Sequence, residues 1–96
     1  MEEIKMKLVI NTCYGGFSIP DRFCKELGLA DSYSSISRDD ERLINLIERN
    51  GGFIEGFCSF LEVVEIPDEA TDYEIFEYDG NEEVICVVNG KLCHYR

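Results

Sequence analysis

Short runs of strand-forming residues, separated by residues that make tight turns, fill the last third of the chain and leave few folds open to it. Four such runs are predicted as strands: residues 60–66, 73–78, 83–88 and 91–95. Pro67 ends the first run, and Asp79-Gly80 and Asn89-Gly90 end the second and third. Asn-Gly is a strong hairpin signal, because both residues accept the positive φ angles of a type I′ turn. The pattern therefore predicts consecutive antiparallel strands.

The first half of the chain has a different pattern, in which one strand precedes two helices. Residues 4–11 begin with polar and apolar residues in alternation and end in an apolar run, which predicts a strand in the middle of the sheet. A helix is predicted from Ser18, a favoured N-cap, to about Leu27. Pro20 is tolerated in its first turn, and Gly28 is a typical stop.

The second helix is predicted over residues 39–49. Acidic residues at its start favour the positive end of the helix dipole, and Asn50-Gly51 ends it. Four residues at helical spacing form its apolar stripe: Leu43, Ile44, Leu46 and Ile47. This stripe predicts which side of the helix faces the core.

The order of these elements, β-α-α-β-β-β-β, predicts an α+β fold with two helices packed on one face of a mainly antiparallel sheet. With 96 residues, 45% of them hydrophobic, the chain is expected to form a single domain, residues 1–96. The residues expected in its core are Leu8, Ile10, Phe23, Leu27, Leu43, Ile44, Ile47, Val64 and Ile75.

The net charge of −11 argues against two classes of partner. A chain this acidic is repelled by the phosphates of DNA and RNA and by anionic membranes, so we expect no direct nucleic-acid or membrane binding. No stretch approaches the roughly 18–20 apolar residues that span a bilayer. The polar, acidic N-terminus is unlike a signal or transit peptide, and we therefore expect a cytoplasmic protein.

The negative charge is concentrated in the second half of the chain. Residues 51–90 contain eleven acidic residues and no Lys or Arg, whereas residues 1–50 carry nine acidic and seven basic residues. A solvated acidic face that favours solubility is one explanation, and a surface that meets a basic partner protein is the other. Strands place alternate residues on one face, so carboxylates from several strands are expected in rows that bind this partner. These are Glu62, Glu74, Glu77, Glu82 and Glu83.

Five cysteines form no C-x-x-C pair, and their number is odd. In a chain without a signal peptide they are expected to be reduced, mostly buried thiols that act as small apolar residues. The only histidine, His94, adjoins Cys93 at a spacing that standard zinc sites do not use. We therefore expect neither a metal nor another cofactor.

The loop after the first strand is the one candidate for catalysis or ligand binding. Cys13 precedes Gly15-Gly16, where backbone N–H groups can stabilise an oxyanion, and His94 is the candidate base. The alternative role for Cys13 is to close the core at the end of a strand. The same loop, Cys13-Tyr14-Gly15-Gly16-Phe17, is also a candidate anion or nucleotide site, although it has no neighbouring Lys and no third glycine.

The block Asn11-Thr12-Cys13-Tyr14-Gly15-Gly16-Phe17-Ser18, with Arg38-Asp39 and the segments 64–68 and 73–80, resembles a family of small uncharacterised proteins of bacteriophages, prophages and large DNA viruses. The resemblance extends from about Lys7 to Glu83. It implies a small accessory or host-interaction role in the host cytoplasm and no established activity. Relatives tend to end in an aromatic and basic tail, whereas residues 85–96 of this chain are predicted to form an Asn-Gly hairpin.

From these features we expect a non-catalytic viral or prophage accessory protein whose acidic C-terminal half binds a basic host protein, such as one that handles nucleic acid. A Cys-dependent enzyme or a small-molecule or nucleotide site at residues 13–16 is the alternative. A homodimer formed through the exposed strand of residues 91–95 also remains open.

Overall fold

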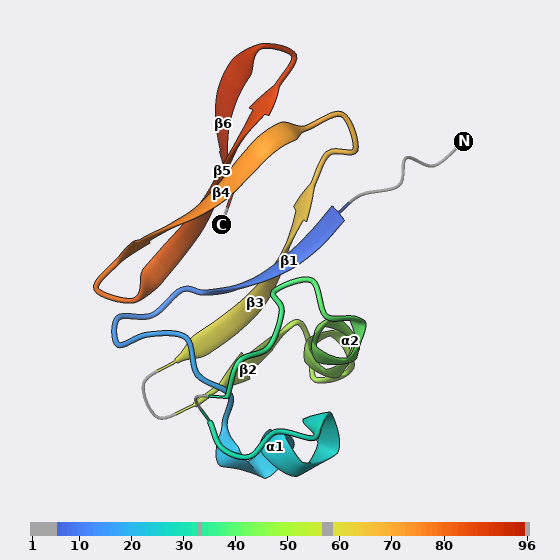
Figure 1. Ribbon diagram of the computed structural model, residues 1–96, viewed down its shortest axis with the longest axis vertical. Coiled ribbons are helices and arrows are strands. Elements are labelled where there is room, and N and C mark those ends of the chain that lie inside the picture. Colours follow the sequence, from blue (N-terminus) through green and yellow to red (C-terminus); the bar gives the residue numbers. More distant parts are fainter. Residues whose placement is uncertain (1–5, 33, 57–58, 96) are drawn as a thin grey trace.

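The computed structural model describes residues 6–32, 34–56 and 59–95, which contain two helices and six strands (Figure 1). In chain order these are β1 (Met6–Asn11), α1 (Asp21–Leu27), α2 (Glu41–Arg49), β2 (Phe53–Glu55), β3 (Phe60–Ile66), β4 (Thr71–Tyr78), β5 (Asn81–Val88) and β6 (Lys91–Tyr95). The predicted α+β class and the predicted order of elements are confirmed, and the structure adds the short strand β2 to that order.

The described strands form two antiparallel sheets, ordered β1-β3-β2 and β4-β5-β6. The prediction that the first strand lies in the middle of the sheet was wrong, because β3 is the central strand and β1 lies at an edge. All six residues of β1 pair with β3, and the three residues of β2 pair with β3 on its other side. The segment before α2 covers the free side of β1, where the Val9 N–H donates to the Arg38 carbonyl oxygen at 2.8 Å.

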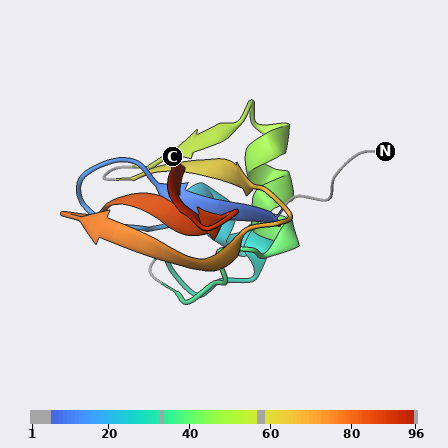
Figure 2. The same cartoon turned by 90° about the horizontal axis from the view of Figure 1, so that it is seen from above.

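The first sheet is covered on both faces (Figures 1 and 2). On one face α1 and α2 pack against a buried cluster of strand residues: Val9, Ile54 and Leu61, with Val63 partly buried. This arrangement confirms the prediction that both helices pack on one face. On the other face the residues that alternate with them pack against the second sheet: Leu8, Ile10, Val64 and Ile66.

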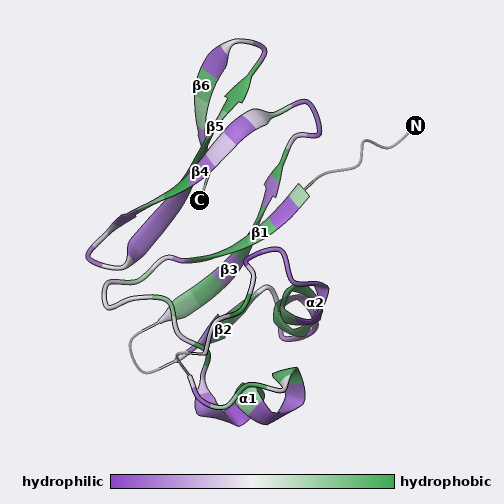
Figure 3. Cartoon of the chain, viewed as in Figure 1, coloured by the Kyte–Doolittle hydropathy of each residue, from purple (hydrophilic) through white to green (hydrophobic). Residues whose placement is uncertain are grey.

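The second sheet contributes its inner face to this second cluster. Val84 and Cys86 of β5 are fully buried there, and Ile75 and Tyr95 pack against them from β4 and β6. The predicted core residues are all buried except Phe23 and Ile75, which are partly buried at the margins of the two clusters. Much of β4 is hydrophilic, whereas much of β1 and β3 is hydrophobic (Figure 3).

Both helices begin later than predicted. The N-cap of α1 is Pro20 and not Ser18, because Ile19 is fully buried and its N–H donates to the Ser32 carbonyl oxygen at 2.9 Å outside any helix. α2 begins after Asp40, whose carboxylate accepts from the Arg42 N–H at 2.8 Å and so caps the helix. Among the described residues, no helix is long and apolar enough to cross a membrane.

Two tight turns connect the strands of the second sheet. Asp79 and Gly80 have φ angles of 52° and 88°, and Asn89 and Gly90 have φ angles of 53° and 78°. Positive φ at both central residues is the signature of a type I′ turn. The predicted hairpin at Asn89-Gly90 is therefore confirmed, and the turn at Asp79-Gly80 has the same form.

Candidate functional site

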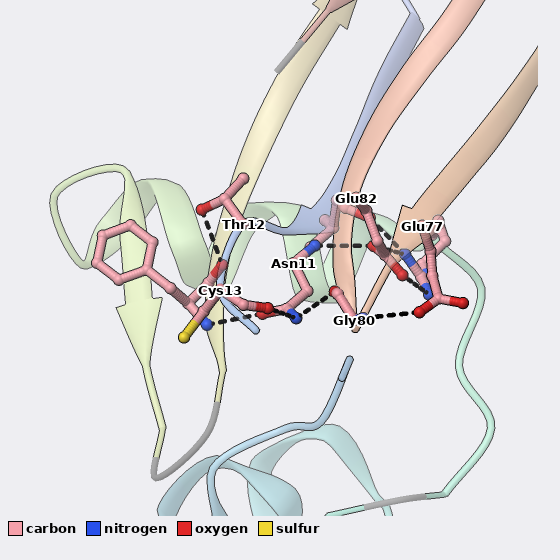
Figure 4. A network of polar contacts seen from close by, with 9 residues as sticks. Asn11, Thr12, Cys13, Glu77, Gly80 and Glu82 are labelled. Carbon is pink, nitrogen blue, oxygen red and sulfur yellow. Dashed lines mark hydrogen bonds and ion pairs between the residues drawn. The ribbon is translucent and has the colours of Figure 1, made fainter. Parts of the chain in front are cut away.

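The N-T-C-Y-G-G-F block leaves the end of β1 and meets the turn between β4 and β5 (Figure 4). Asn11 is fully buried at this junction. Its Nδ2 donates to the carbonyl oxygens of Cys13 at 2.7 Å and Gly80 at 2.6 Å, and its Oδ1 accepts from the Phe60 N–H at 2.8 Å. The Asn11 side chain thus joins β1, β3 and the β4–β5 turn. It needs both an N–H donor group and a carbonyl acceptor to do so, and an ionised carboxylate, which has no hydrogen to donate, could not replace it.

A buried ion pair lies next to Asn11. Glu82 of β5 is only 5% exposed, and its carboxylate accepts from the Asn11 N–H at 2.8 Å. Both Glu82 oxygens also bind the Arg38 guanidinium, at 2.6 and 2.9 Å, and that guanidinium lies 3.8 Å from the centre of the Phe17 ring. Glu82, which was expected on the partner-binding surface, therefore lies in the interior and is neutralised by Arg38.

The glycines of the block pack against the β4–β5 turn. A Cβ atom on Gly80 would lie 2.7 Å from the Gly16 Cα and 2.8 Å from the Gly15 carbonyl carbon, so the two backbones are in direct contact. The Gly15 N–H donates to the Asp79 carbonyl oxygen at 2.8 Å. One of the amides expected to hold an anion is thus already occupied, whereas Tyr14 is 61% exposed beside it.

The structure places the two candidate catalytic residues in different surroundings. Cys13 is half-buried, and its thiol donates to the Tyr14 carbonyl oxygen at 3.4 Å. His94 lies on β6 with its Nδ1 3.2 Å from the Glu83 carboxylate. Within the described ranges no hydrogen bond joins Cys13 to His94.

The other thiols divide between the interior and the surface layer. Cys24 and Cys86 are buried and Cys93 is half-buried, while Cys58 lies outside the described residues. Burial raises the pKa of the Cys86 thiol, and desolvation likewise raises the pKa of the neighbouring Tyr95 hydroxyl. Both groups are therefore kept neutral on the inner face of the second sheet.

The second sheet has an uncovered side, here called the outer face, which is directed away from the first sheet. Phe76 and Glu74 of β4 lie opposite Glu83 and Ile85 of β5 in the register of the second sheet. Ile85 in turn lies opposite His94 of β6. The alternate residues of β5 face the core, so these residues share the opposite side. The outer face consists of Glu74, Phe76, Tyr78, Glu83, Ile85, Val87, Leu92 and His94.

Large apolar side chains are accessible on the outer face. Phe76 is 50% exposed, Leu92 is 67% exposed and Tyr78 is 74% exposed. A hollow of about 330 Å³ lies beside Phe76 and Leu92, and its other lining residues are Asp72, Glu74, Ile85 and Val87. Sequence reasoning missed this apolar surface. Residues 84–88 are apolar at odd and even positions alike, a pattern that predicts apolar side chains on both faces of β5 and would have identified Ile85 and Val87.

The five carboxylates predicted to bind a partner do not form one row. Glu74 and Glu83 lie on the outer face, and Glu82 is buried. Glu77 lies at the edge of the sheet, where its carboxylate accepts from the Gly80 N–H at 2.6 Å. Glu62 belongs to the first sheet and accepts from the Thr12 hydroxyl at 2.7 Å. The outer face therefore combines two of the predicted carboxylates with apolar residues that were not predicted.

Within the described residues, no Lys or Arg forms an ion pair with a carboxylate of the outer face. Ion pairs of the described Lys and Arg residues lie on β1, on the helices and at Glu82, and none includes Asp72 or Glu74. On the helical side the Arg42 guanidinium lowers the pKa of the Asp40 carboxyl through a hydrogen bond. The side chain next to Glu83 is the His94 imidazole. Negative charge is thus balanced on the helical side and left uncompensated around Glu74.

Neither a metal centre nor a known relative identifies the site. Across residues 6–32, 34–56 and 59–95, no three His, Cys, Asp or Glu side chains are grouped to hold a metal ion. Comparison of the chain with protein-family models, with curated proteins and with solved structures finds no match. The exposed apolar side chains and carboxylates of the outer face are therefore the features that indicate a function.

Proposed function

We propose that this protein is a non-catalytic binding protein that docks on a basic partner protein through the outer face of its second sheet. The observation that carries the proposal is a group of exposed apolar side chains, Phe76, Tyr78 and Leu92, next to the carboxylates of Asp72 and Glu74, with which no described Lys or Arg forms an ion pair. Exposed apolar groups rimmed by charge are typical of protein interaction sites.

The two kinds of side chain have different roles in such an interface. Burial of Phe76 and Leu92 supplies affinity through the hydrophobic effect. Carboxylates such as Glu74 and Glu83 attract a positively charged surface, speed its encounter and exclude acidic proteins. The network around Asn11 holds the β4–β5 hairpin rigidly against the first sheet, so the face is already formed before binding.

The proposed partner is a host protein with a basic surface, such as one that handles nucleic acid, because a surface that binds phosphates also attracts carboxylates. The resemblance of residues 11–18 to small phage, prophage and large-DNA-virus proteins supports an accessory role in the cytoplasm of a host cell. The negative charge of the chain supports binding of a protein over direct binding of nucleic acid.

The proposal is tested by capturing a host protein with the immobilised chain, identifying it, and measuring its affinity for variants by calorimetry. The double variant Glu74→Gln, Glu83→Gln removes two charges from the outer face and keeps the side-chain volumes. We expect the dissociation constant of a basic partner to rise at least fivefold, and the difference from the unchanged protein to shrink as salt screens the charges.

The matched control is Glu55→Gln, Glu65→Gln, which changes the net charge equally on exposed residues of the first sheet. It should bind as tightly as the unchanged protein. Equal losses in both double variants would show that net charge alone matters, and no loss in either would exclude the carboxylates of the outer face from the interface. Iodoacetamide labelling tests the enzymatic alternative, which requires Cys13 to react much faster than the other thiols.

A further inference from the structure

The strand β4 forms an open edge of the second sheet. It is eight residues long, and β5 is the strand hydrogen-bonded to it within the described chain. Nearly all of its residues are exposed, and only Ile75 packs partly against the core. An edge of this length presents unpaired backbone N–H and C=O groups that can accept another strand.

The register identifies which backbone groups of β4 face outward. Tyr78 and Asn81 flank the two-residue turn, and in such hairpins the flanking pair exchanges both hydrogen bonds. Every second residue repeats this arrangement, so Phe76 and Glu74 direct their backbone groups towards β5. Ile75 and Glu77 therefore direct their N–H and C=O groups away from the sheet, towards the open side.

The edge lacks most of the features that block strand pairing. β4 contains no Lys and no Pro, which commonly protect edges. Its irregularity is confined to the start, where the register shifts between Thr71 and Glu74, and pairing is regular from Glu74 to Tyr78. The regular part is long enough to pair with five residues of an extended chain.

The charge of the edge selects what can pair with it. Asp72, Glu74 and Glu77 line β4, and residues 51–90 contain no Lys or Arg. Pairing of two copies along β4 would place carboxylates opposite carboxylates with no base on either strand, which is destabilising. A strand that alternates basic with apolar residues and carries Lys or Arg on the side of the outer face would instead form a cross-strand ion pair with Glu74, while its apolar residues lie on the side of Ile75.

We propose that β4 binds an extended, basic segment of the partner protein as a fourth strand of the second sheet. This inference rests on the proposed function and specifies how the partner is held. Backbone bonds to Ile75 and Glu77 supply the pairing, and alternate side chains of the added strand extend the outer face beside Glu74, Phe76 and Tyr78. The partner segment therefore alternates basic with apolar residues.

The experiment is amide hydrogen exchange of the full chain by NMR, with and without a synthetic peptide of four Lys-Val repeats with blocked ends. In the free protein we expect slow exchange at Glu74, Phe76 and Tyr78 and fast exchange at Ile75 and Glu77. At saturating peptide and low salt, exchange at Ile75 and Glu77 should slow at least tenfold.

A matched pair of variants checks the charge selection. Glu74→Gln, Glu77→Gln should weaken peptide binding at least fivefold while preserving the pattern of protection at saturation, because the glutamine amides keep the backbone pairing and lose only the charge. The control Glu55→Gln, Glu65→Gln should bind the peptide as the unchanged protein does.

Three outcomes would overturn the proposal. Peptide binding that leaves Ile75 and Glu77 unprotected would show docking on the outer face without strand addition, and the proposed function would stand. No binding at 1 mM peptide and low salt would show that the carboxylates of β4 only prevent aggregation. Protection of Ile75 and Glu77 that rises with protein concentration alone would show a homodimer instead.

Discussion

The two sheets of this protein are built from similar strands but are used differently. The first sheet is buried on both faces, by the helices on one side and by the second sheet on the other. The second sheet is buried on one face only, and its outer face leaves Phe76, Tyr78 and Leu92 exposed. The first sheet therefore supplies stability, and the second sheet supplies an accessible surface.

This difference gives a chain of 96 residues both a packed core and an accessible apolar surface. A side chain that is fully packed adds to the stability of the fold but is lost as a contact for another molecule. The junction at Asn11 allows the division, because its hydrogen bonds fix the second sheet to the first through a small polar cluster. The outer face then needs no covering element to stay in place.

The largest effect is expected from breaking this junction. Asn11→Asp keeps the shape of the side chain but removes both hydrogens that Nδ2 gives to Cys13 and Gly80, and it places a second carboxylate beside Glu82. We expect the free energy of unfolding to fall by about 4 kcal/mol, the range typical of an uncompensated buried charge. Urea unfolding followed by circular dichroism measures it.

The control for this variant is Asn45→Asp, because Asn45 is an exposed residue of α2. Its effect should stay within about 0.5 kcal/mol, as for most surface substitutions. If Asn11→Asp were as stable as Asn45→Asp, the polar junction would not be what joins the two sheets.

The second prediction compares the two turns of the second sheet. Gly80 and Gly90 have similar positive φ angles, but only Gly80 lies against another backbone, whereas nothing lies within 4 Å of a Cβ at Gly90. Gly90→Ala should cost about 1 kcal/mol for the left-handed conformation alone. Gly80→Ala should cost about 3 kcal/mol, because the Cβ also forces the loop of Gly15 and Gly16 away.

Thermal unfolding of the two alanine variants side by side measures this difference. Equal losses would mean that conformation alone determines the choice of glycine in both turns. A greater loss in Gly80→Ala would show that the glycines of the N-T-C-Y-G-G-F block serve the packing of the turn.

Most of the fold could be predicted from local patterns, and the arrangement of strands could not. The turn at Asn89-Gly90 and the strands around it depend on a few neighbouring residues, which is why they were placed correctly. β2 has three residues, too few to show an alternation. The apolar run of β1 predicted a central strand, but the run arises because β1 is an edge strand whose two faces are both buried. The pairing of β1 with β3 joins residues that are 50 to 60 positions apart, and no local pattern encodes it.

The candidate site was predicted in part. The concentration of acidic residues directed the prediction to the second half of the chain, but Glu82 was predicted on the same face as Glu83, although neighbouring residues of a strand lie on opposite faces. Glu82 is in phase with Val84 and Cys86, which are buried, whereas Glu83 is in phase with Ile85 on the outer face. The period of two in β5 therefore contained the signal. Its partner Arg38 is 44 positions away and could be found only in the structure.

The smallest effect on stability is expected on the outer face, and it sharpens the contrast between the two sides of one sheet. Leu92→Thr and Val84→Thr both introduce a residue that strands favour. Leu92 is 67% exposed, so its replacement should change the free energy of unfolding by no more than about 0.5 kcal/mol. Val84 is fully buried, so the same residue there places a hydroxyl in an apolar cluster and should cost about 2 kcal/mol. Urea unfolding of both variants measures this difference. The affinity for the partner should show the reverse order: it should fall for Leu92→Thr and stay unchanged for the folded fraction of Val84→Thr. A loss of stability in Leu92→Thr equal to that in Val84→Thr would show that the outer face is part of the packed core and is not held open for a partner.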